Sequence, residues 1–195
     1  MKRNVVLAGV GGQGLLSIAA VLGEAARAEG LYLKQAEVHG MAQRGGVVES
    51  HIRYADSPIC SDLIREGTAD LILSLEPMEA LRHVQFLSVD GAIITSNAPV
   101  KNIADYPEID SIYAELRKLP RAAVIEAERL AREAGSPRCL NMVMLGAGSS
   151  RLGLSSESLR RGIETVFAGK SRKIVEMNLR GFSLGLEAAT AALGE

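Results

Sequence analysis

The stretch that decides the fold lies near the N-terminus, where residues 5–14 read Val-Val-Leu-Ala-Gly-Val-Gly-Gly-Gln-Gly. Its first four residues are apolar and partly β-branched, which is typical of a strand buried on both faces. The next six fit the spacing G-x-G-x-x-G, and apolar residues at three- and four-residue intervals then run to Gly30. This order of strand, glycine turn and helix predicts an anion-binding loop at the start of an α/β domain.

The rest of the chain continues the alternation of strand and helix. Short apolar runs predict further strands at residues 31–36, 47–54, 71–75, 92–95 and 122–125. Helical patterns cover residues 77–86, 126–134, 140–152, 156–167 and 171–193. We therefore expect residues 1–195 to form one doubly wound, Rossmann-like α/β domain, with a mostly parallel sheet, helices on both faces and a helical C-terminal third.

Composition narrows the class of partner. The 22 basic and 23 acidic residues nearly cancel, so no global field favours nucleic acid or an anionic membrane. No segment has the ~18 uncharged apolar residues of a membrane helix or the core of a signal peptide, and we expect a cytoplasmic protein. Cys60 and Cys139 are too few for an iron–sulfur cluster, which takes four ligands, and we expect no metal site.

The glycine motif alone leaves three alternatives open. A dehydrogenase that binds NAD needs an acidic residue at the end of the second strand, and Glu37 stands at about that distance after Gly14. A nucleotide-sensing module would use the same loop without catalysis. The glycines could also serve only to pack the first strand tightly against its helix.

Two groups of polar residues are expected at the surface. In the predicted strand 47–54, Glu49, His51 and Arg53 alternate with apolar residues, and such a polar face normally meets solvent, with a subunit contact as the alternative. His83 follows Arg82 in a helical segment and is likewise expected to be exposed.

A second segment, residues 37–46, reads Glu-Val-His-Gly-Met-Ala-Gln-Arg-Gly-Gly. Together with residues 9–14 it resembles the gamma-type domain of the 2-oxoacid:ferredoxin oxidoreductases, and within that family the beta subunit of the indolepyruvate enzymes. The resemblance continues through residues 67–73, 76–82 and 141–146, so it covers most of the chain.

The resemblance implies an oxidative decarboxylation. A 2-oxoacid such as indolepyruvate or another arylpyruvate reacts with coenzyme A, and ferredoxin receives the electrons through the complex. It also implies a large alpha subunit that carries thiamine diphosphate, magnesium and [4Fe-4S] clusters, whereas this chain holds no cofactor tightly. We therefore expect the isolated chain to be inactive and to be a candidate for self-association.

The expected cofactor-binding residues come from both segments. They are Gly9, Gly11, Gly12, Gln13, Gly14, His39 and Arg44. Arg44 offers a planar fork for phosphate or carboxylate and His39 a contact that protonation can change. The alternatives are a solvated loop cation for Arg44 and a turn residue for His39, and no residue is assigned to catalysis.

Overall fold

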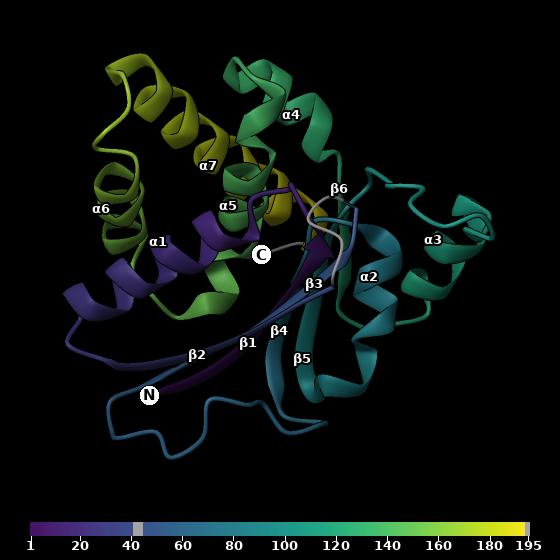
Figure 1. Cartoon of the computed structure of the whole chain (residues 1–195), viewed down its shortest axis with the longest axis horizontal. Helices are drawn as coiled ribbons and strands as arrows, with labels where there is room; N and C mark the ends of the chain where they lie inside the picture. The colour runs from purple at the N-terminus through teal and green to yellow at the C-terminus, as the bar shows by residue number, and fades with distance from the viewer. Residues whose placement is uncertain (41–44, 194–195) are drawn as a thin grey trace.

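The computed structural model describes residues 1–40 and 45–193, which form a six-stranded sheet between two layers of helices (Figure 1). The strands are β1 (Lys2–Val10), β2 (Tyr32–His39), β3 (Val47–Ala55), β4 (Ala69–Ser74), β5 (Leu87–Ser96) and β6 (Ala122–Ile125), in the spatial order β2-β3-β1-β4-β5-β6. The strands β1, β4, β5 and β6 run parallel, whereas β3 is antiparallel to both of its neighbours. The sheet is therefore mixed, and β3 is the exception to the expected parallel arrangement.

Helices cover both faces of the sheet, as expected. One layer holds α1 (Leu15–Ala28), α4 (Ala127–Ala134), α5 (Leu140–Leu152), α6 (Ser156–Val166) and α7 (Arg172–Leu193) (Figure 1). The other holds α2 (Pro77–Arg82) and α3 (Ile109–Arg117), and the short 3₁₀ turns η1 (Val84–Phe86) and η2 (Pro137–Cys139) complete the elements. Alternation along β1 sends Leu7 into the larger core and Val6 into the smaller one.

Most boundaries follow the sequence pattern, and α5 and β6 begin and end where their patterns predict. The helix α3 was not predicted. It buries only Ile112 and Leu116, one helical turn apart, and the rest of its sequence is largely polar. Two contact residues are too few to give a strong periodic signal, so tertiary packing decides this helix.

The C-terminal third is built around α5, which is buried on nearly every side. The helix α7 crosses it so closely that glycines are required at the contact. A Cβ atom at Gly146 would lie 1.9 Å from the carbonyl oxygen of Phe182, and one at Gly185 would lie 1.8 Å from that of Val143. Neither obstacle is a flexible side chain, so the two helix backbones would have to separate.

The close crossing of α5 and α7 predicts that one methyl group added at the contact destabilises the protein strongly. Gly146→Ala or Gly185→Ala should lower the free energy of unfolding by about 3 kcal/mol or more, because overpacking a rigid contact moves backbone. Gly23→Ala in α1 is the matched control. Nothing lies within 4 Å of its Cβ position, so it should stabilise by about 0.5–1 kcal/mol. Urea unfolding of the three variants measures both, and similar values for all three would refute the close crossing.

Candidate functional site

The glycine loop lies at the carboxyl end of β1, beside the carboxyl end of β4. Some of its amides are already used: Gly11 N–H donates to the carbonyl of Gly46 at 2.8 Å, and Gln13 N–H donates to that of Val10 at 3.2 Å. Gly12 and Gly14 have φ values of 99° and 86°, which other residues rarely adopt. The sharp turn that the motif predicts is therefore present.

The side chain of Gln13 is used inside the protein. Its Oε1 atom accepts from Val10 N–H at 2.9 Å, and its Nε2 group donates to the carbonyl of Leu75 at 3.0 Å. A Cβ atom at Gly9 would lie 2.7 Å from Gln13 Oε1, so the glycine leaves room for this side chain. Gly9 and Gln13 thus shape the loop, and both ends of the Gln13 amide are occupied by the protein's own backbone.

The start of α1 faces an open groove. Within the described part of the chain, no acceptor is found for the N–H groups of Gly12, Gly14, Leu15 and Leu16. The first turn of α1 contains no acidic residue, so the positive end of the helix dipole is not offset by a side chain there. These groups line a groove of about 580 Å³, the α1 groove, whose other walls include Ser17 and His39.

His39 reaches the α1 groove from the end of β2. Its Nε2 atom lies 2.6 Å from Glu37 Oε1, and its side chain is about half exposed. The antiparallel register sets His39 opposite Val48 on β3, next to the end of β1, so two segments of the motif share one groove. Arg44 lies outside the described residues.

A second cleft continues from the α1 groove around the start of α5, and the sequence reasoning missed it. The basic cleft, of about 470 Å³, is lined by Ser17, Arg138, Asn141, Lys170 and apolar residues of α7. Asn141 Nδ2 donates to the carbonyl of Gly14 at 3.2 Å, which fixes the two helix starts side by side. Arg138 and Lys170 are exposed and add two positive charges near the loop.

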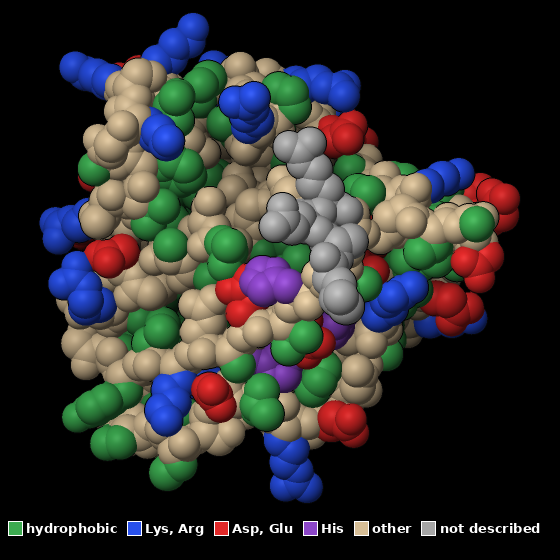
Figure 2. Space-filling view, viewed as in Figure 1, with side chains coloured by type: hydrophobic (Ala, Val, Ile, Leu, Met, Phe, Trp, Pro, Cys, Tyr) green, Lys and Arg blue, Asp and Glu red, His purple; other side chains and the backbone are tan. Residues whose placement is uncertain are grey.

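The sequence predicted that His51 on the polar face of β3, and His83 after α2, would be exposed. This prediction is wrong, because both are buried. The side chains of His51 and His83 are buried, and the Glu49 carboxylate lies between them, 2.5 Å from His51 Nε2 and 3.2 Å from His83 Nε2. Ile64 N–H donates to His51 Nδ1 at 2.9 Å, and the ring of Phe86 lies edge-on to His51. On the molecular surface seen in Figure 2, histidine side chains lie near the middle, with acidic side chains beside them.

Glu79 on α2 is a further buried acid next to this group. Neither of its carboxylate oxygens has a hydrogen-bond partner among the described residues, although Arg82 Nε lies 3.6 Å from one of them. Burial raises the pKa of Glu79, with a smaller increase from Glu76, and Arg82 and His83 oppose the shift. Glu79 therefore stays protonated to a higher pH than an ordinary glutamate does.

The cysteines do not fit an iron–sulfur cluster. Cys60 is exposed and Cys139 is buried, and burial raises the pKa of the Cys139 thiol, which disfavours the thiolate that a cluster needs. Among the residues that the structure describes, no three His, Cys, Asp or Glu side chains gather in a way that could hold a metal ion.

The raised pKa of Glu79 predicts a pH-dependent stability. Above its ordinary pKa of 4.5 the unfolded chain loses this proton while the folded chain keeps it, so stability falls as the pH rises from there to the folded-state pKa. Glu79→Gln cannot ionise. Its free energy of unfolding, minus that of the parent, should rise by about 1.4 kcal/mol for each pH step of one between the two pKa values. Urea unfolding across pH tests this, and a difference that stays flat above pH 4.5 would contradict it.

Two relatives of this chain, both named indolepyruvate oxidoreductase subunit IorB, come from Archaeoglobus fulgidus and Thermococcus kodakarensis. The first is 38% identical and covers 97% of this chain and 96% of the relative; the second is 37% identical, with 99% and 98% covered. Within the described residues, no helix is both long and apolar enough to cross a membrane.

Solved structures share the fold. The gamma subunit of a keto/oxoacid ferredoxin oxidoreductase from Geobacter sulfurreducens aligns with a TM-score of 0.70 over 98% of both chains, at 21% identity. A 2-oxoglutarate:ferredoxin oxidoreductase from Magnetococcus marinus, solved with 2-oxoglutarate, coenzyme A and succinyl-CoA bound, aligns with a TM-score of 0.77 at 21% identity. That match covers 97% of this chain and 31% of the other.

The family profile named pyruvate ferredoxin/flavodoxin oxidoreductase matches residues 4–188. This match and the near-full-length relatives confirm the resemblance seen in residues 9–14 and 37–46. The chain belongs to the pyruvate ferredoxin/flavodoxin oxidoreductase family.

Proposed function

We propose that this chain is the small subunit of an indolepyruvate or arylpyruvate:ferredoxin oxidoreductase. The observation that carries the proposal is its match, at 36–38% identity and over nearly the whole length of both chains, to four relatives named as a subunit of indolepyruvate oxidoreductase. The chain acts together with a large alpha subunit, to which we assign thiamine diphosphate, magnesium and the [4Fe-4S] clusters. The two cysteines of this chain are consistent with that division.

The proposed reaction is an oxidation, and the electron carriers assigned to the partner accept the electrons that it releases. The bond between the two carbonyl carbons of the 2-oxoacid breaks and releases carbon dioxide, and the coenzyme A sulfur forms a thioester with the remaining acyl group. One proton and two electrons are released, and ferredoxin accepts the electrons through the clusters of the complex.

The role proposed for this chain is to hold an anionic group. The amides at the start of α1, which find no acceptor among the described residues, and the positive end of that helix favour phosphate. His39 lines the same groove, and Arg138 and Lys170 extend it with positive charge. We assign this surface, with Arg44, to the phosphates of coenzyme A or to the diphosphate of the partner's cofactor.

The strand order argues against the alternative of an NAD-dependent dehydrogenase. In a dinucleotide-binding domain, the acidic residue that holds the ribose ends a strand next to β1. Here β3 lies between β1 and β2, and Glu37 pairs with Ser50 of β3. Glu37 is also engaged with His39 at 2.6 Å.

The proposal predicts activity only in the assembled enzyme. The isolated chain should show no oxidation of indolepyruvate with a viologen acceptor, and activity should appear when the large subunit is added. The measurement is anaerobic viologen reduction with coenzyme A, with the large subunit alone as the control. Turnover by the purified single chain would refute the proposed division of cofactors.

Arg44 provides a second test. In the reconstituted complex, Arg44→Ala should lower the affinity for coenzyme A, or the rate, about tenfold to a hundredfold, because a charge-assisted hydrogen bond contributes about 1.5–3 kcal/mol. Thermal unfolding of the lone chain should change little. Arg172→Ala is the control, since Arg172 is exposed and pairs with Glu176 on α7. Unchanged kinetics in Arg44→Ala would leave Arg44 as a solvated cation.

A further inference from the structure

Glu76 lies just after β4 and before α2, and its side chain is fully buried. Three donors converge on its carboxylate. Glu79 N–H donates to Oε2 at 2.8 Å, Val100 N–H donates to Oε1 at 3.3 Å, and the hydroxyl of Tyr106 donates to Oε1 as well. An ionised carboxylate accepts at both oxygens, so it suits a site at which only donors arrive.

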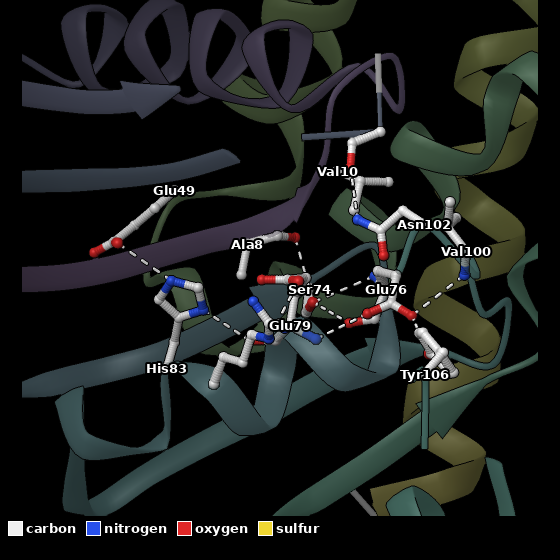
Figure 3. A network of polar contacts seen from close by, with 12 residues as sticks. Ala8, Val10, Glu49, Ser74, Glu76, Glu79, His83, Val100, Asn102 and Tyr106 are labelled. Atoms are coloured by element: carbon white, nitrogen blue, oxygen red, sulfur yellow. Dashed lines mark hydrogen bonds and ion pairs between the residues drawn. The ribbon is translucent and has the colours of Figure 1, made fainter. Parts of the chain in front are cut away.

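The contacts of Glu76 fix the loop of residues 97–106 over the carboxyl edge of the sheet. Figure 3 shows Val100 and Tyr106 pointing at Glu76 from this loop, with Asn102 between them and Val10. Asn102 N–H donates to the carbonyl of Val100 at 2.8 Å, so the position of Asn102 depends on the segment that Glu76 holds.

Asn102 links the loop of residues 97–106 to the glycine loop through hydrogen bonds. Its Nδ2 group donates to the carbonyl of Gly45 at 2.6 Å. Gly45 N–H then donates to the carbonyl of Gly11 at 3.3 Å, and Gly11 N–H donates to that of Gly46 at 2.8 Å. A continuous series of hydrogen bonds therefore joins the buried carboxylate to the loop that forms the α1 groove.

We propose that Glu76 is a positioning residue for the α1 groove, acting through Val100, Tyr106 and Asn102 to hold Gly45 and Gly46 against Gly11. The ligand-binding consequence rests on the proposed function, whereas the coupling between the two loops does not. Glu76 is fully buried and does not line the α1 groove, so it acts through the loop. It fixes the backbone of the loop whose amides face the groove.

The series can be cut at one link without disturbing the core. Asn102→Ala removes the donor to Gly45 and leaves the carboxylate and its three donors in place. Tyr106→Phe removes one of those donors. Glu76→Gln replaces one accepting oxygen with an NH₂ group, which cannot accept a hydrogen bond from the donors around it. Tyr54→Phe is the matched control, because it also removes a buried tyrosine hydroxyl, which donates to the Leu152 carbonyl at 2.7 Å on the other side of the sheet.

The first measurement is amide hydrogen exchange at Gly11 and Gly45 in the full chain, followed by NMR, with thermal unfolding alongside. We expect exchange at these two amides to rise about tenfold or more in Asn102→Ala, with little change in the melting temperature. Tyr106→Phe and Glu76→Gln should raise it in the same direction. Tyr54→Phe should lower the melting temperature and leave exchange at Gly11 and Gly45 close to that of the parent.

The second measurement is the KM for coenzyme A in the complex reconstituted with the large subunit. Asn102→Ala should raise this KM with a smaller change in kcat. Unchanged exchange at Gly11 and Gly45 in both Glu76→Gln and Tyr106→Phe would overturn the positioning role of Glu76, whatever Asn102→Ala shows and even if coenzyme A binds normally. Increased exchange with an unchanged KM would support the positioning role and contradict the assignment of coenzyme A to the α1 groove.

Discussion

The arrangement at the carboxyl edge of the sheet depends on the side-chain amide of Gln13. It accepts a hydrogen bond from Val10 N–H and donates one to the carbonyl of Leu75, which follows β4. Leu75 N–H in turn donates to the carbonyl of Ala8. The ends of β1 and β4 are thereby joined at the level of the glycine turn. With these ends fixed, the start of α1 and the buried Glu76 lie on neighbouring connections.

The antiparallel strand β3 gives this edge its particular composition. Because β3 returns beside β1, it brings Gly46 to the glycine loop and His39 to the α1 groove. It also separates Glu37 from β1. A parallel strand in that place would need a longer crossover and would bring its other end to the loop. The strand–glycine–helix unit is that of a dinucleotide-binding domain. Because β3 is antiparallel, the groove beside this unit is lined by His39, and Glu37 is kept away from β1.

Local patterns were enough for the main elements and for the glycine turn. The apolar run of residues 5–8 and the G-x-G-x-x-G spacing predicted β1, the turn and α1, because these features are set by neighbouring residues. Long-range contacts decided what the sequence could not reveal. The alternation in β3 looked like a solvated face, yet η1 and Ile64 cover His51. The roles of Glu76 and Asn102 likewise depend on partners that are distant in the sequence.

The burial of α5 also bears on how the chain folds as it is synthesised. Translation adds α5 before α6 and α7, and α7 alone is 22 residues long. Until α7 leaves the ribosome, the side of α5 that packs against α7 stays uncovered. The nascent chain therefore cannot complete the packing around α5 until α7 has been synthesised.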